Sequence, residues 1–124
     1  SFGGAYDLNG IFWMTLFNSN SGRFLYAYAG SNQWTGFILG SNQLSEIAVD
    51  SYNTKWIVSG SVQAAGVYFF NENGSLTNPS DDIYGFYNNA DFGPEITNIT
   101  DVIVDKKNEV WITTNNVIFI INNP

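Results

Sequence analysis

The sequence predicts an all-β fold built from β-propeller blades, each a four-stranded antiparallel sheet, and two observations carry this prediction. An aspartate is followed six residues later by a tryptophan at three places, 43 and 55 residues apart: Asp7 and Trp13, Asp50 and Trp56, Asp105 and Trp111. Periods of about 40 to 50 residues that contain several short apolar runs are typical of propeller blades. In addition, no window of a dozen residues has the 3.6-residue apolar period of a helix. We therefore expect about two and a half blades in this chain.

Residues 1–43 form the expected first blade, which is the most divergent copy. It keeps the distance from Asp7 to Trp13 but moves the asparagine of the other copies by one place and adds a glycine, as Asn9-Gly10. Its fourth strand is expected near residues 34–39.

Residues 44–100 form the expected second blade. We predict strands over 46–50, 54–59 and 66–70, and a fourth near 83–87, with a tight turn at 51–53. In this turn the Asp50 carboxylate can bond to backbone N–H groups and Asn53 can adopt a left-handed conformation. Gly66 opens the third strand, where a residue that accepts positive φ is expected, and Asn116 is its counterpart in the last copy.

Residues 101–124 form the expected third blade, which is partial because the sequence stops after its third strand. Here Asp105, Asn108 and Trp111 repeat the offsets of Asp50, Asn53 and Trp56. A fourth strand is missing, which would leave an unpaired edge and an exposed apolar face. We therefore expect a segment of a larger propeller, completed by further blades of a longer chain or by other subunits.

The repeated tryptophans are expected to fill the gaps between blades. Residues 67–70 and 117–121 are apolar at successive positions, so both faces of these strands need cover. Stacked neighbouring blades supply that cover, and we assign the Asp-to-Trp repeat a structural role.

Composition narrows the class of partner. Eleven acidic residues against four basic ones give a formal net charge of −7, which repels nucleic acid and anionic lipid surfaces. No stretch approaches the ~20 apolar residues of a membrane helix, so direct membrane insertion is not expected. The chain has no cysteine, which excludes thiolate metal sites but assigns no redox compartment.

Catalysis is not expected, because the chain has neither histidine nor cysteine. Asp81 and Asp82 are adjacent and would point apart in an extended segment, which is poor geometry for an acid and base pair. A role in a turn or loop cap is the preferred reading for these two residues, with catalysis or a calcium site as the alternatives. We predict no catalytic residue, no cofactor and no metal site.

Aromatic residues gather in the segment 83–92, where Tyr84, Tyr87 and Phe92 form a possible binding surface. Such rings beside small polar residues can stack sugars or anchor a protein partner. The preferred alternative is that Tyr84, Phe86 and Tyr87 lie in the outer strand and pack between blades. Phe92, next to Gly93-Pro94, is expected on a loop.

Residues 47–57 and 102–114 resemble the two-component-regulator propeller repeat of bacterial extracytoplasmic sensors. Residues 66–74 and 80–84 look more like the propeller family of the type IX secretion attachment complex. The Val58-Ser59 and Thr113-Thr114 pairs depart from the Gly-Thr common in such repeats. The resemblance implies a non-enzymatic, periplasmic or cell-surface scaffold that binds other proteins or a surface glycan. The alternatives are the sensor propeller of a hybrid histidine kinase and, less favoured, a carboxylate-dependent glycan hydrolase or lyase.

Overall fold

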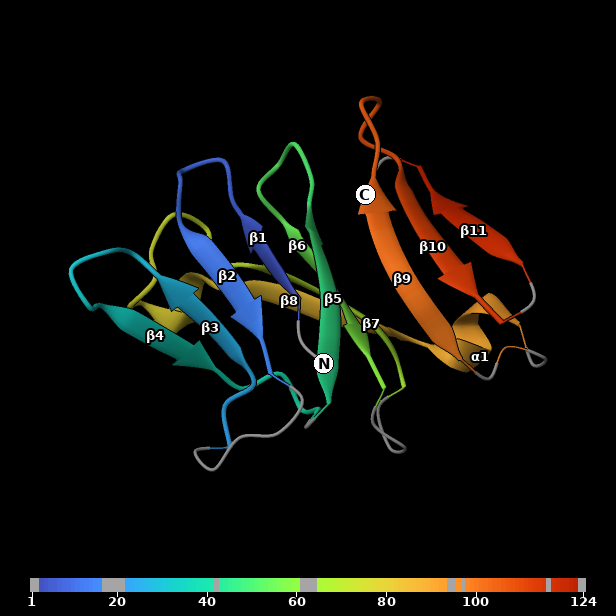
Figure 1. Cartoon of the computed structure of the whole chain (residues 1–124), viewed down its shortest axis with the longest axis horizontal. Coiled ribbons are helices and arrows are strands. Elements are labelled where there is room, and N and C mark those ends of the chain that lie inside the picture. Colours follow the sequence, from blue (N-terminus) through green and yellow to red (C-terminus); the bar gives the residue numbers. More distant parts are fainter. Residues whose placement is uncertain are drawn as a thin grey trace.

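The fold is all-β, as predicted, and the described residues form three antiparallel sheets and two very short helices (Figure 1). The computed structural model describes residues 3–16, 22–41, 43–60, 65–93, 96, 98–115 and 117–122. Within these ranges, no helix has both the length and the apolar character needed to cross a membrane. We call the sheets the first, second and third blades, in chain order.

The first blade has four strands in the order β1-β2-β3-β4. They are β1 (Gly4–Tyr6), β2 (Phe12–Thr15), β3 (Leu25–Tyr28) and β4 (Trp34–Phe37). The second blade repeats this order with β5 (Leu44–Val49), β6 (Lys55–Ser59), β7 (Gly66–Asn71) and β8 (Ile83–Asn88). Within each of these blades, every strand pairs with the next one in sequence, so hairpin connections set the topology.

The third blade has three strands among the described residues, β9 (Ile99–Val104), β10 (Val110–Thr114) and β11 (Ile118–Ile121). It begins two residues before the boundary expected at residue 101, because Ile99 already pairs with Thr114 and is buried. The register also corrects the expected counterpart of Gly66 in this blade. Trp111 lies opposite Ile120 as Trp56 lies opposite Phe69, which makes Val117 the counterpart of Gly66. Asn116, the expected counterpart, lies outside the described residues.

Two short helices interrupt the β pattern around β8. The 3₁₀ helix η1 (Pro79–Asp81) begins after Asn78, whose side chain accepts a hydrogen bond from the Ser80 N–H. The helix α1 (Asn89–Phe92) follows β8, and Asn88 and Asp91 form a reciprocal capping box at its start. Phe92 therefore ends a helical turn, and the expectation that it lies on a loop was wrong.

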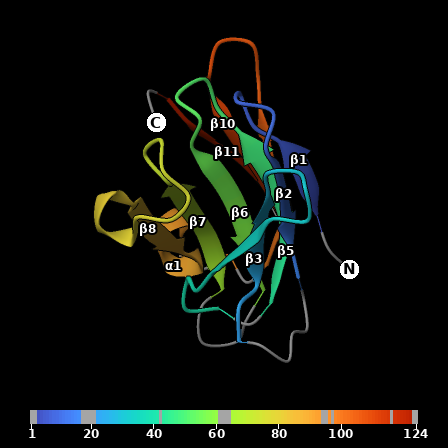
Figure 2. The same ribbon diagram turned by 90° about the vertical axis from the view of Figure 1, so that its left-hand side faces the viewer.

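The second blade lies between the other two, and the three first strands are neighbours: β5 contacts both β1 and β9 (Figure 1). The hairpin turns that follow β1, β5 and β9 all point to the same end of the molecule, uppermost in Figures 1 and 2. These are the turns that begin with Asp7, Asp50 and Asp105. Since these turns lie side by side, residues about 50 positions apart in sequence can contact each other.

The hydrophobic core consists of two layers, one in each gap between blades. The layer between the first and second blades includes Trp13, Leu25, Ile57 and Phe70. The layer between the second and third blades is built from Trp56, Val58, Val67, Val102, Val110 and Ile112. Each blade thus uses one sheet face to cover the next, which satisfies the apolar character of both faces of β7.

Candidate functional site

The three aspartate turns have the same hydrogen-bond geometry. In each turn, Oδ1 of the aspartate accepts hydrogen bonds from the backbone N–H groups two and four residues later, at 2.8 to 3.0 Å. The residue at the third position has a left-handed backbone, with φ of 81° at Gly10, 67° at Asn53 and 63° at Asn108. Glycine and asparagine tolerate this conformation best, which explains both residue types at one offset.

The other carboxylate oxygen of each aspartate accepts a hydrogen bond from the repeated tryptophan. The distances from the indole Nε1 to Oδ2 are 2.8 Å for Trp13, 2.9 Å for Trp56 and 2.8 Å for Trp111. Sequence reasoning assigned the aspartate to the turn and the tryptophan to the gap between blades, but missed this direct bond. The constant spacing of six residues was the signal that could have revealed it.

The repeat asparagine joins neighbouring blades, a role that sequence reasoning also missed. Oδ1 of Asn53 accepts a hydrogen bond from the backbone N–H of Leu8 at 2.8 Å, and Oδ1 of Asn108 accepts one from Ser51 at 2.7 Å. In both cases the donor directly follows the aspartate of the preceding blade. We call this contact the asparagine clamp. The clamp satisfies an N–H of the preceding blade's turn that the aspartate of that same turn does not reach.

A buried ionic group lies only between the first and second blades among the described residues. The side chain of Lys55 is fully buried, and its Nζ lies 2.6 Å from Glu72 and 3.4 Å from Asp7. It also donates to the carbonyl oxygen of Asn53 at 2.8 Å and lies 4.4 Å from the centre of the Trp13 ring. These contacts compensate for much of the free energy of taking three charges out of water.

The pKa of Asp7 reflects this environment. Burial alone would raise it, but hydrogen bonds from the Trp13 indole and from backbone N–H groups, together with Lys55, hold the pKa below its ordinary value. On the third blade, hydrogen bonds from the Glu109 backbone and the Trp111 indole lower the pKa of Asp105. Both carboxylates are therefore acceptors at neutral pH, as the turn requires.

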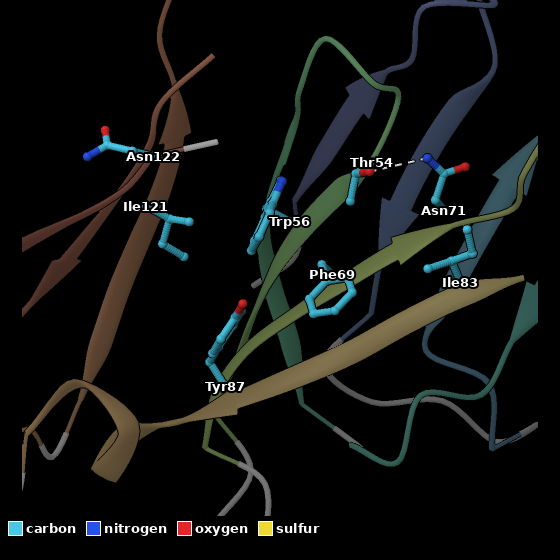
Figure 3. Close-up of a pocket in the computed structure, with 8 residues that line it drawn as sticks. All are labelled: Thr54, Trp56, Phe69, Asn71, Ile83, Tyr87, Ile121 and Asn122. Atoms are coloured by element: carbon cyan, nitrogen blue, oxygen red, sulfur yellow. Dashed lines mark hydrogen bonds between the residues drawn. The ribbon is translucent and has the colours of Figure 1, made fainter. Parts of the chain in front are cut away.

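A pocket of about 390 Å³ opens between the second and third blades (Figure 3). Its wall on the second blade carries three aromatic rings: Trp56 and Tyr87 lie nearly parallel, 6.4 Å apart, and Phe69 lies 5.5 Å from Trp56. Ile83 and, across the gap, Ile121 add apolar surface, while Thr54, Asn71 and Asn122 add polar groups. Rings beside hydroxyl and amide groups can pack on an apolar or sugar surface and orient it by hydrogen bonds.

The pocket draws on four separate segments, which explains why the sequence did not reveal it. Two local features shape it. A side chain at Gly85 would overlap the Phe69 ring, so glycine lets that ring lie over β8. A side chain at Gly66, where φ is 156°, would overlap the Tyr87 carbonyl oxygen, so glycine also permits the close approach of β7 and β8.

The structure separates the three residues of the predicted binding surface. Tyr87 is at the pocket, and Phe92 lies 6.2 Å from it and 5.3 Å from Phe119 of the third blade. Tyr84 is exposed but lies an odd number of residues from Tyr87, on the face of β8 turned toward the first blade. Phe86 shares that face and packs on Tyr68 at 4.5 Å. A single surface can therefore include Tyr87 and Phe92 but not Tyr84.

Asp81 is the last residue of η1 and Asp82 is its C-cap, whereas the side chain that caps this helix is that of Asn78 at its start. Burial raises the pKa of Asp82, and repulsion from Asp81 and Glu72 adds to the effect. Oδ1 of each aspartate is buried and accepts no hydrogen bond from the residues that the structure describes. Across the ranges that the structure describes, no group of three acidic side chains is placed to hold a metal ion.

Comparison with known proteins supports the fold. No family model and no curated protein matches the chain. Among solved structures, it is similar to PorZ, described as an essential bacterial surface component of the type IX secretion system of Porphyromonas gingivalis, with a TM-score of 0.80 and 24% sequence identity. The match covers 98% of this chain and 18% of PorZ, so the chain spans less than a fifth of that protein's length.

Proposed function

We propose that this chain is a non-enzymatic, extracytoplasmic propeller segment that serves as a scaffold or recognition module in bacterial type IX secretion or cell-surface attachment. The observation that carries the proposal is the structural similarity to PorZ over 98% of the chain. The sequence resemblance to the propeller family of the attachment complex points in the same direction. The partners are other proteins or further blades, and a surface glycan is an alternative ligand.

The pocket between the second and third blades is the proposed recognition surface. Its rings are already ordered by contacts with one another, so a ligand would bind with little loss of side-chain freedom. Tyr87 is the best residue to test, because it lines the pocket and retains 37% exposure. The absence of histidine and cysteine from the sequence supports binding rather than catalysis.

The test is genetic complementation in a bacterium that encodes this chain and secretes by the type IX route. Deletion of the gene should reduce the amount of secreted protein attached to the cell surface. Complementation with Tyr87→Ala should restore less attachment than complementation with Tyr84→Ala. The two variants remove the same side chain from opposite faces of β8, which makes Tyr84→Ala the matched control. Melting curves of both variants check that they are folded.

Four results would contradict the proposal. Normal attachment after deletion would exclude the secretion role, and loss of a transcriptional response to an oligosaccharide would favour a histidine-kinase sensor instead. A cytoplasmic location in cell fractionation would exclude an extracytoplasmic module. Turnover of a glycan that is lost in both Asp81→Asn and Asp82→Asn would indicate an enzyme.

A further inference from the structure

Among the described residues, the turn that follows Asp105 in the third blade has one backbone N–H without the asparagine clamp that the equivalent N–H has in the other two turns. The N–H groups of Leu8 and Ser51 each bond to an asparagine of the following blade. Lys106 holds the equivalent position after Asp105, and the remaining bonds of its turn match those of the other two. In the part of the chain that the structure describes, no side chain accepts from the Lys106 N–H.

The sheet face that carries Trp111 is equivalent to a face that is covered elsewhere in the molecule. Register places Ile103, Ile118 and Ile120 on this face where the second blade has Ala48, Val67 and Phe69. Those residues of the second blade pack in the layer shared with the third blade. On the third blade the three isoleucines are 53%, 59% and 44% exposed.

The molecule itself shows what covers such a face. Trp13 and Trp56 are both buried by the opposite face of the following blade, which supplies apolar residues such as Phe70 or Val102. At both places the cover also brings an asparagine at the third position after its own aspartate. Apolar packing and the asparagine clamp therefore occur together at both interfaces.

We propose that the Trp111 face of the third blade binds a further blade of the same repeat, and that this blade is selected by an asparagine whose amide oxygen accepts a hydrogen bond from the Lys106 N–H. The apolar face supplies most of the affinity, because a covering blade removes its isoleucines and Trp111 from water. This hydrophobic contribution is non-directional, so it does not distinguish one apolar blade from another. The asparagine supplies the selection, because the Leu8 and Ser51 N–H groups both bond to such an acceptor, and a covering blade without one forgoes this hydrogen bond to the Lys106 N–H.

The first blade of a second copy of this chain does not meet that requirement. Gly10 occupies the position of Asn53 and Asn108, so it has no side chain that could accept from Lys106. The structure leaves room for one, because no atom lies within 4 Å of a Cβ built on Gly10. Asparagine at this φ is also compatible with the backbone, as Asn53 and Asn108 show. Gly10 therefore disfavours head-to-tail association of identical copies.

The test uses a tandem of two complete chains joined by a flexible Gly/Ser linker, with only the first copy isotope-labelled. Amide hydrogen exchange is then measured at Lys106 of the first copy. With Gly10 unchanged, Lys106 should exchange at the rate seen in the single chain. With Gly10→Asn in the second copy, exchange at Lys106 should slow roughly tenfold, as expected for one hydrogen bond.

Gly74→Asn in the second copy is the matched control, since Gly74 has a φ of 88° and open space around it but lies in a different turn. Protection of Leu8 and Ser51 reports that the labelled copy is folded. Fast exchange at Lys106 in the Gly10→Asn tandem would overturn the proposal. Equal protection with Gly10 unchanged or with Gly74→Asn would overturn the selective role of asparagine.

Discussion

The two interfaces between blades share their hydrogen-bond frame but differ in what they bury. Each has an aspartate turn, a tryptophan bonded to that aspartate, and an asparagine clamp. The first interface adds Lys55 between Asp7 and Glu72, whereas the register of the second places Val110 at the position of Lys55. The repeat therefore defines how blades stack, and the residue before the tryptophan makes one interface different from the other.

This difference separates general stacking from pairing of particular blades. An apolar layer accepts any neighbour of suitable shape, while a buried lysine needs carboxylates within reach, at least one of them on the facing blade. Asp7 provides one such carboxylate and the second blade provides the other, Glu72. We infer that the ionic group orders the first and second blades, and that the second interface relies on packing.

Replacing Lys55 with methionine should have the largest effect on this comparison. It leaves Asp7 and Glu72 buried without their cation, and breaking a buried pair in this way destabilises by about 3 to 5 kcal/mol. Urea unfolding monitored by tryptophan fluorescence measures the loss. Lys107→Met, at an exposed lysine, is the control and should change stability by less than about 0.5 kcal/mol.

Adding Glu72→Met to Lys55→Met should recover part of that stability, because one of the two unpaired carboxylates is removed. If Lys55→Met alone is as stable as the unaltered chain, the ionic group does not hold the first interface together.

Removing a tryptophan should have a similar effect at the second interface but a much smaller one at the open face. Trp56 is 3% exposed, and Trp56→Ala should destabilise by about 3 to 5 kcal/mol. Trp111 is only partly buried, so Trp111→Ala should lose less than about half of that. Equal losses in the two variants, measured by urea unfolding, would mean that packing between blades is not what Trp56 contributes.

The asparagine clamps should contribute less, about 1 kcal/mol each. Glycine keeps the left-handed backbone, so Asn53→Gly and Asn108→Gly remove the amide without imposing strain. Amide exchange should become faster at Leu8 in the first variant and at Ser51 in the second. Asn53→Gly should be the more destabilising, since the Asn53 amide also donates to Asp7 at 3.4 Å. Faster exchange at both amides in both variants would indicate general unfolding instead.

Acidification should produce the smallest effect, and mainly at the first interface. The folded pKa of Asp7 is below its ordinary value of 3.8, so its stabilisation is present above that value and is lost as the pH falls through the folded pKa. The free energy of unfolding, measured from pH 5 down to a pH below the folded pKa of Asp7, should therefore fall less steeply in Asp7→Asn than in the unaltered chain.

Asp82→Asn should have the opposite effect to Asp7→Asn. The pKa of Asp82 is raised in the fold, so ionisation of this group destabilises the fold as the pH rises. Removing it should increase stability at neutral pH. For the Asp7 prediction, if Asp7→Asn leaves the loss of stability at acid pH unchanged, protonation of Asp7 is not the cause of that loss.

The sequence by itself determined the all-β class, the repeat and the left-handed turn positions. These are local properties: a six-residue spacing, an alternation of side chains and a residue type that tolerates positive φ are all visible within one hairpin. The apolar character of residues 117–121 is also visible in the sequence, and the structure shows that Ile118 and Ile120 are exposed.

Only the tertiary structure decided what lies between blades. The clamp joins residues 45 and 57 positions apart, the Lys55 group joins two blades, and the pocket combines four segments. Tyr84 and Tyr87 are alike in sequence, yet the pleat of β8 turns them to opposite gaps. Such contacts depend on how sheets stack, and the physical reason is that stacking is set by many weak apolar contacts that no local pattern specifies.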